Sequence, residues 1–125
     1  MTTLITGTIC IFVFHWIADY VLQKGEWAKA KSADPVSLLK HTSLYSVMWF
    51  IPMIPLLGII ESVIFVAVTF FIHTYQDSIT SQKVKEMFES ETYYTPLPNV
   101  GVFSFMGFDQ LLHYLQLYIL FILLL

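Results

Sequence analysis

Arginine is absent from this 125-residue chain, cysteine occurs once, and charged residues make up only 12% of the sequence. Charged residues usually supply about 25% of a soluble domain. The net charge of −3 and the lack of arginine argue against a nucleic-acid-binding surface. The single cysteine, Cys10, excludes a disulfide framework and a thiolate metal site. The missing residue types therefore remove several common classes of function.

Apolar residues, in contrast, account for 57% of the chain, and the mean hydropathy is +0.71. A soluble bundle of this size would leave a large apolar surface in water. The sequence therefore predicts an all-α, polytopic membrane protein with one domain over residues 1–125. The N-terminal Met-Thr-Thr-Leu-Ile-Thr-Gly has no basic stretch. We therefore expect the first apolar run to stay as a membrane helix rather than to be cleaved as a signal peptide.

Four apolar runs approach the length of about 20 residues that a membrane-spanning helix needs. They predict a four-transmembrane-helix bundle with spans at about 4–23, 38–60, 61–79 and 108–125. Gly58 and Glu61 separate the second and third spans, and Pro52 and Pro55 are expected to kink the outer part of the second.

Two polar connections, 24–37 and 80–107, join these spans. In the first, Ser32 or Asp34 is expected to cap the following helix. In the second, the charged segment Ser81–Ser90 is expected to prolong the third helix. Tyr93–Gly107, which contains proline, glycine and aromatic residues, is expected to form an irregular loop at the interface.

Lysine placement predicts the orientation in the membrane. All six lysines lie in these connections or at their borders: Lys24, Lys29, Lys31, Lys40, Lys83 and Lys85. By the positive-inside rule, both connections face the cytoplasm and both termini face outward.

Three of the four histidines lie one helical turn from an aspartate: His15–Asp19, His73–Asp77 and Asp109–His113. At that spacing both side chains of a pair project from one helix face. The predicted topology brings all three pairs and His41 into the cytoplasmic half. A single pair in a membrane helix is more typical of an interhelical hydrogen bond. Three pairs at one depth favour a shared polar site.

Histidine and aspartate are the ligands that Zn²⁺, Mn²⁺ or Fe²⁺ uses when no thiolate is available. Zinc is the ion that we expect first, with either one or two ions bound. The predicted ligands are Asp19, His73, Asp77, Asp109 and His113. His15 and His41 are further ligands or acid–base groups, although His41 follows Lys40 and also suits an interfacial position. Gln23, Lys31, Thr74, Ser78 and Gln110 are candidates for binding a substrate or for stabilising developing negative charge, and Gln23 and Gln110 are the ones that we expect to be catalytic.

Several of these residues also carry a family resemblance. The string His15-Trp-Ile-Ala-Asp19-Tyr-Val-Leu-Gln23, then Trp27-Ala-Lys-Ala-Lys31 and Leu39-Lys-His41, resembles domain of unknown function family 3307. His73-x-x-x-Asp77 and Asp109-Gln110-x-x-His113 match that family's pattern as well. The resemblance covers nearly the whole chain and implies a phage or bacterial inner-membrane protein, but no established activity. The arrangement also looks like intramembrane zinc hydrolases of the ceramidase type, although the order of motifs differs.

These observations lead to three functional hypotheses. The first is a membrane-embedded, metal-dependent hydrolase that acts from the cytoplasmic side on a lipid or amphipathic small molecule. The second is a transporter or channel component that relays protons or passes a metal ion. The third is a non-enzymatic phage membrane protein, such as a holin-like or exclusion factor. The expected partners are the lipid bilayer and a lipid-like substrate, and a homo-oligomer is compatible with so thin a bundle.

Overall fold

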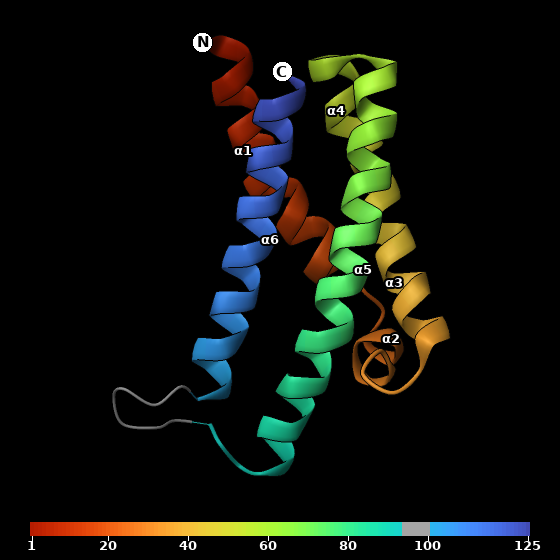
Figure 1. The fold of residues 1–125 in the computed structure, drawn as a ribbon, viewed down its shortest axis with the longest axis vertical. Coiled ribbons are helices and arrows are strands. Elements are labelled where there is room, and N and C mark those ends of the chain that lie inside the picture. The colour runs from red at the N-terminus through yellow and green to blue at the C-terminus, as the bar shows by residue number, and fades with distance from the viewer. Residues whose placement is uncertain (94–100) are drawn as a thin grey trace.

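The computed structural model describes residues 1–93 and 101–125, and the regular elements in these ranges are all helical, which confirms the predicted fold class. In chain order they are α1 (Thr2–Trp16), the π-helical turn η1 (Ile17–Val21), α2 (Gly25–Ala30), α3 (Pro35–Met48), α4 (Phe50–Leu57), α5 (Ile59–Glu89) and α6 (Val102–Leu124). Helix α5 is central, because α3, α4 and α6 all pack against it (Figure 1).

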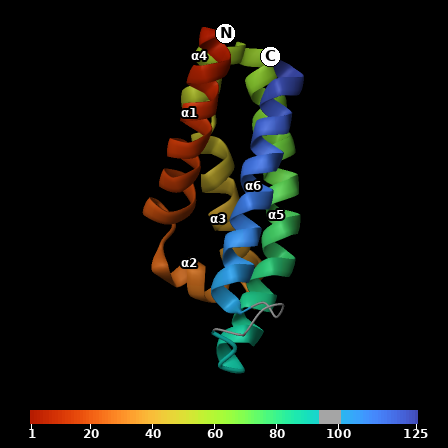
Figure 2. The same ribbon diagram turned by 90° about the vertical axis from the view of Figure 1, so that its left-hand side faces the viewer.

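Both chain termini lie at one end of the helices, together with the turn between α4 and α5. We call this the terminal end. Helix α2 lies toward the opposite end, which we call the α2 end. Figure 2 shows the same separation from the side, with α1 beside α6 near the termini. Helix α1 packs against α6 and α4.

Three helical stretches are long and apolar enough to cross a membrane: Thr2–Val21, Ile59–Glu89 and Val102–Leu124. The surface that they present is also apolar, since Ile60 is 72% exposed, Phe71 71% and Leu123 75%. A contiguous surface of this kind is unfavourable in water. The helix lengths and the exposed side chains are therefore consistent with a membrane protein.

The second predicted span, 38–60, is not one continuous helix. Helix α3 has 14 residues and α4 has 8, with Trp49 between them. Pro52 accounts for the position of the break, because a proline ring clashes with the carbonyl four residues earlier, which here belongs to Met48. The Trp49 N–H instead donates to the Ser46 carbonyl over 3.1 Å. Three of the four predicted spans thus correspond to single long helices, whereas the second corresponds to the pair α3 and α4.

The connections follow local chemistry. Gly58 reverses the chain between α4 and α5 at φ 97°, in the left-handed region that favours glycine. Asp34 caps α3 as expected, accepting hydrogen bonds from the backbone N–H groups of Val36 and Ser37 at 3.1 and 2.9 Å. Hydrogen bonds from the Ser37 hydroxyl and from these N–H groups hold the pKa of Asp34 below its usual value. The short helix α2 was not predicted.

The second connection is only partly as predicted. Helix α5 continues to Glu89, which confirms that the charged segment prolongs the third helix. Helix α6 begins at Val102 rather than at Phe108, so the irregular loop predicted over Tyr93–Gly107 was wrong in its final part. Residues 94–100 of that loop lie outside the described residues.

The apolar core lies mainly toward the terminal end and comprises Ile11, Ala18, Tyr45, Trp49, Met53, Phe65, Leu117 and Phe121. Helices α1 and α6 approach closely there, because a Cβ added at Gly7 would lie only 2.1 Å from Phe121 Cζ. The absence of a side chain at Gly7 therefore leaves room for a fully buried aromatic ring. This packing fixes α1 against α6 and so sets the positions of the polar residues about two to three turns further along each helix.

Candidate metal centre

Asp19 lies in the π-helical turn at the end of α1. The Leu22 N–H donates to the Ile17 carbonyl over 2.9 Å, which is the i to i+5 bond of a π-turn. In the widened turn two successive residues, Ala18 and Asp19, are both buried. Such turns are rare in helices and occur frequently at functional sites. The sequence pattern showed the His15–Asp19 spacing, but not this local geometry.

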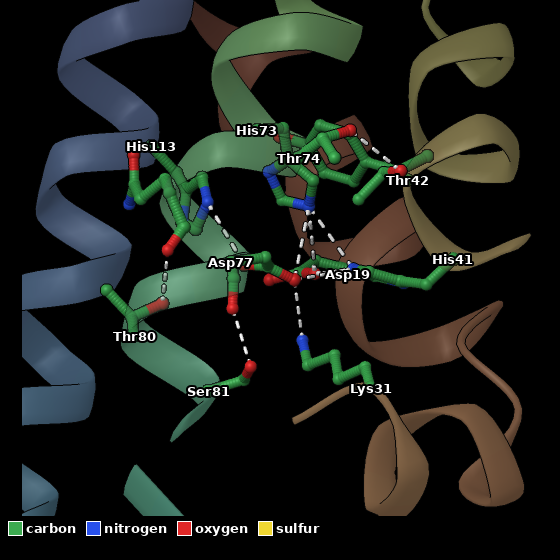
Figure 3. Close-up of polar contacts among 12 residues, drawn as sticks. Asp19, Lys31, His41, Thr42, His73, Thr74, Asp77, Thr80, Ser81 and His113 are labelled. Carbon is green, nitrogen blue, oxygen red and sulfur yellow. Dashed lines mark hydrogen bonds and ion pairs between the residues drawn. The ribbon is translucent and has the colours of Figure 1, made fainter. Parts of the chain in front are cut away.

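The structure brings together all three sequence pairs and His41. We call these residues the His/Asp cluster: His15, Asp19, His41, His73, Asp77, Asp109 and His113. All seven are buried, and they come from α1, η1, α3, α5 and α6. Figure 3 shows His41, His73 and His113 around the carboxylates of Asp19 and Asp77. His41, for which the sequence also allowed an interfacial position, is 1% exposed and lies inside the cluster.

Four of these side chains surround one point. His41 Nε2 lies 3.2 Å from His73 Nε2, 3.2 Å from Asp19 Oδ1 and 3.3 Å from Asp77 Oδ2. His73 Nε2 lies 3.9 Å from the same Asp19 oxygen and 3.7 Å from the same Asp77 oxygen. Four ligands placed tetrahedrally at about 2.0 Å from a zinc ion would be separated by about 3.3 Å. The separations from His41 are thus close to those expected between ligands of one metal ion, and Asp19, His41 and His73 form a set whose ligand atoms lie within 4.8 Å of one another.

The two oxygens of Asp77 face different neighbours. Oδ2 faces His41 and His73, whereas Oδ1 lies 3.5 Å from His113 Nε2. A carboxylate in this position can bind one ion through each oxygen. The arrangement is therefore compatible with a second ion position on the His113 side.

Some nitrogen atoms of the cluster have no hydrogen-bond partner among the described residues. They are both ring nitrogens of His113 and Nδ1 of His73. A buried polar atom without a partner costs about 1–3 kcal/mol. Three overlapping sets place ligand atoms within 4.8 Å of one another: His15–Asp19–His113, Asp19–His41–His73 and His73–Asp77–His113. A metal ion would supply the missing partner and offset the buried negative charge.

His15 is held by a directional chain of hydrogen bonds. The Gln110 amide N–H₂ faces Asp109 Oδ2 at 3.3 Å, so its Oε1 faces His15 Nε2 at 2.7 Å. Because an amide oxygen only accepts, His15 Nε2 carries the proton and donates it. Nδ1 then accepts from the Tyr45 hydroxyl over 2.7 Å. This chain fixes both the tautomer and the orientation of the imidazole.

Asp109 lies at the edge of the cluster. Its Oδ1 accepts a hydrogen bond from Gln76 Nε2 over 2.9 Å, and its Oδ2 lies 3.8 Å from His113 Nδ1. It belongs to none of the three potential ligand sets within the described chain, whereas His15 and His41 each belong to one. The geometry therefore suits Asp109 to orienting Gln110 and His113. Supporting contacts of this kind tune the ligands of many metal sites.

Lys31, just beyond α2, reaches into the cluster from the α2 end (Figure 3). Its Nζ donates to Asp77 Oδ2 over 2.7 Å, and its side chain is 17% exposed. The same Asp77 oxygen faces His41 and His73. The ammonium therefore supplies positive charge at one corner of the potential ion site.

A cavity of about 460 Å³ adjoins the cluster. Cavities of roughly 300–1,000 Å³ are typical of small-molecule sites. Its lining includes three cluster aspartates and residues of α2, α5 and α6: Asp19, Tyr20, Gln23, Ala28, Lys29, Lys31, Ser32, Asp77, Thr80, Ser81, Val84, Lys85, Phe88, Glu89, Met106, Asp109 and Gln110. The cavity gives a ligand access to the carboxylates of the cluster.

The other predicted substrate contacts are divided. Gln23, Lys31 and Gln110 line the cavity, and the amide nitrogen of Gln23 is buried without a partner among the described residues. Thr74 instead donates to Thr42 across α5 and α3, and Ser78 donates to a carbonyl of its own helix. These last two are outside the cavity lining.

Sequence reasoning missed Tyr45 and Gln76 as parts of the site. Tyr45 stacks on His73 with ring centroids 3.8 Å apart and binds His15, while Gln76 holds Asp109. Tyr45 follows His41 by one helical turn, so the same-face rule that selected the His–Asp pairs could also have selected this tyrosine. Gln76 had no comparable signal.

These features define a class: an all-helical protein with membrane-length helices around a buried His/Asp site that could hold a metal ion. The chain belongs to the family described as protein of unknown function (DUF3307), whose sequence profile matches residues 8–125. This confirms the resemblance carried by the His and Asp motifs. No curated protein and no solved structure matches the chain.

Proposed function

We propose that this protein is a membrane-embedded, metal-dependent hydrolase that acts on a lipid or amphipathic small molecule near the cytoplasmic face. The observation that carries the proposal is the close approach of His41 to His73, Asp19 and Asp77 beside a cavity. Three protein ligands, such as the set Asp19, His41 and His73, would leave a fourth position of the ion open to water or substrate, which is typical of catalytic rather than purely structural metal sites.

Zinc is the ion that we propose, bound as one or two ions. Nitrogen and carboxylate ligands in tetrahedral array suit zinc, and no thiolate lies in the cluster. A bound divalent ion would lower the pKa of a water ligand to about 7 and so make a nucleophile available at neutral pH. The Asp77 carboxylate, with His113 at its other oxygen, would hold the second ion.

The remaining residues take supporting roles. His15 is fixed by Gln110 and Tyr45 and serves as an acid–base group beside the site. Gln23 and Gln110 line the cavity, where their amide groups would contact the substrate. Asp109 orients Gln110 and His113 and, if the substrate reorders this edge of the cluster, supplies a further ligand.

We further propose four membrane crossings, with α3 and α4 together forming the crossing that lacks a continuous helix. Lys24, Lys29 and Lys31 lie in or beside α2, and Lys83 and Lys85 lie near the end of α5. These positions support a cytoplasmic α2 end and termini on the outer side, in a bacterial inner membrane. The His/Asp cluster would then lie in the cytoplasmic half.

Transport of protons or metal ions is the second candidate. It is favoured by buried polar atoms beyond the cluster, namely Ser46 Oγ and Gln116 Oε1, which lack partners among the described residues. Against it, Tyr45 stacks on His73, and the apolar core residues Trp49 and Phe65 follow toward the terminal end. These rings leave the cluster accessible from the cavity side, which supports catalysis more than passage.

Two measurements test the proposal. Elemental mass spectrometry of the purified protein should find at least one equivalent of transition metal, and chelation should lower its thermal stability. Less than about a tenth of an equivalent, with no effect of chelation, would contradict a metal centre.

The zinc-loaded protein is then incubated with a polar lipid extract of a bacterial inner membrane, and products are identified by mass spectrometry. Products should form, and should be lost after chelation and in Asp77→Ala. Zinc or proton flux in liposomes, lost in His73→Ala and without any product, would favour the transporter instead. Intact fold and phenotype after Ala replacement of all three aspartates would favour a non-enzymatic phage protein.

A further inference from the structure

The cavity beside the His/Asp cluster has an uneven distribution of charge. Its acidic lining residues include Asp19 and Asp77, which are 5% and 2% exposed and lie deep in the protein. Lys85 also lines the cavity, but its side chain is 51% exposed. Two negative groups thus lie at the inner end, whereas Lys85 and Glu89, whose side chain is 66% exposed, lie nearer the mouth.

Three of the four carboxylates that line the cavity are engaged by donors or cations, and the fourth, Asp19, lies 3.2 Å from His41 Nε2. Asp77 accepts from Lys31, Asp109 accepts from Gln76, and Glu89 lies 3.8 Å from Lys85. A cationic ligand would therefore have to displace existing partners. The inner carboxylates are also the groups that the proposed metal would use.

The lysines, in contrast, keep donors available. Lys29 makes no ion pair or hydrogen bond within the described residues, and an ammonium has three donors, of which Lys31 directs one to Asp77. Lys29 and Lys31 come from α2 and the residue just beyond it, whereas Lys85 comes from α5. Positive charge thus borders the cavity from two elements (Lys31 is labelled in Figure 3).

Part of the cavity wall is apolar. Val84 and Phe88 on α5, Met106 on α6 and Tyr20 in η1 all line the cavity. Phe88 is 40% exposed and Tyr20 is 51% exposed. Aromatic and aliphatic side chains beside lysines match a ligand with an anionic head and an apolar chain.

We propose that the cavity binds a phosphate-bearing amphiphile, with Lys29, Lys31 and Lys85 around the phosphate and the apolar wall around its chain. The inference rests on the proposed function, because it names the substrate class of that same site. It goes beyond it by requiring an anionic head group rather than a neutral or cationic one.

The test is isothermal titration calorimetry of the purified protein in a non-ionic detergent, with and without added zinc. The probes are dioctanoyl phosphatidic acid, dioctanoylglycerol, a dioctanoyl lipid with a trimethylammonium head group, and inorganic phosphate. Phosphatidic acid should bind about tenfold more tightly than each of the other three. Tighter binding of the cationic or the neutral lipid would overturn the proposal. Equal binding of inorganic phosphate would overturn the amphiphile as ligand.

The matched variants separate the lysines at the cavity from lysines elsewhere. Lys29→Gln combined with Lys85→Gln should weaken phosphatidic acid binding about tenfold, as expected for two partly exposed charges. Lys40→Gln combined with Lys83→Gln removes the same charge from residues outside the cavity lining and should leave binding unchanged. An equal loss of affinity for phosphatidic acid in both double variants would mean that only the net charge of the protein matters, and would overturn the proposed site.

Zinc content, measured on every sample, separates this inference from the proposed function. Full zinc content with no preference for phosphatidic acid would overturn the inference and leave the metal centre standing. Lysine-dependent binding of phosphatidic acid by a protein that takes up no zinc would overturn the metal centre and leave the lipid-binding site standing.

Discussion

The terminal end and the α2 end of the molecule differ in the kind of side chain that they bury: the first buries apolar residues and the second buries ionisable ones. At the terminal end, Gly7 leaves space for Phe121, and Trp49, Phe65 and Leu117 are fully buried around it. Close packing of this kind stabilises helices by dispersion forces even where lipid replaces water. At the α2 end, the protein buries histidines and aspartates, and both ring nitrogens of His113 lack partners among the described residues. The first region is thus mainly a packing contact, whereas the second contains ring nitrogens that remain able to bind a ligand.

This difference bears on the hypothesis that the cluster only holds helices together. Interhelical polar contacts in membrane proteins contribute about 0.6 kcal/mol on average. Polar residues kept for adhesion should use their hydrogen-bonding atoms, as Thr74 does with Thr42. The hydrogen-bonding atoms of His113 that lack partners among the described residues are not what adhesion alone requires.

The largest expected effect comes from removing a central ligand. Asp77→Ala should weaken zinc binding by about 100-fold, or about 2.8 kcal/mol, because both oxygens of this carboxylate face potential ligands. Competition with a fluorescent chelator measures the affinity. Ile11→Val in the apolar core is the matched control and should leave the affinity unchanged. Equal zinc affinities for Asp77→Ala and the parent protein would show that this carboxylate does not bind the ion, and so would contradict a metal site at the α2 end.

A change at the terminal end should lower the stability of the fold but leave zinc binding unchanged. Gly7→Ala places a methyl group against the Phe121 ring and should lower the free energy of unfolding by about 1–3 kcal/mol. Zinc stoichiometry should stay unchanged, since the site lies further along both helices. Thermal unfolding by circular dichroism and elemental analysis check the two parts. Loss of zinc at a temperature where the variant is folded would show that the ends are not independent.

A smaller effect is expected at Lys31. Its ammonium lies 2.7 Å from Asp77 Oδ2 and competes with a cation for that oxygen. Lys31→Met should therefore raise zinc affinity about fivefold, roughly 1 kcal/mol. Lys83→Met, at a solvated ion pair of α5, is the control and should have no effect. A decrease in affinity in Lys31→Met would mean that the lysine supports the site instead of competing with the ion.

The smallest expected effect concerns the cap of α3. The folded-state pKa of Asp34 is lowered by hydrogen bonds from Ser37 and Val36, so its contribution to stability is present above the unfolded value of about 3.9 and is lost as pH falls through the lower folded value. Asp34→Ala should slightly lower the melting temperature at pH 7, and the difference should shrink below about pH 4. Asp34→Asn, which keeps the cap, should stay close to the parent at pH 7. A difference between Ala and parent that does not change with pH would contradict the charge-assisted cap.

Much of the site could be predicted because it depends on helix periodicity. A spacing of one turn places His73 beside Asp77 whatever the rest of the fold does. Lysine placement then predicted a common depth, and the structure brings the pairs together at the α2 end. What periodicity cannot supply is rotation between helices, which decides that Asp77 turns one oxygen to His41 and the other to His113.

The fold was predicted less completely, for equally local reasons. The effect of Pro52 falls on the carbonyl of Met48, so the helix breaks one turn before the proline and not at it. Helix α2 contains one glycine and only 6 residues, too few for a periodic pattern to be recognised. The start of α6 at Val102 is hidden in sequence by phenylalanine and glycine residues that also suit an interfacial loop.

The π-turn at Ile17–Val21 has a consequence for how this chain tolerates changes in length. A π-turn contains more residues than the α-helical turn that it replaces, so a one-residue deletion within it could restore an ordinary α-helix. A deletion at Ile17 or Ala18 would shorten the His15–Asp19 spacing from four residues to three and so move Asp19 by about 100° around the helix axis relative to His15. A conservative-looking deletion in this segment would thus preserve hydrophobicity and helix content while dismantling the aspartate side of the site. In an aligned set of family sequences, gaps should therefore be absent from this turn.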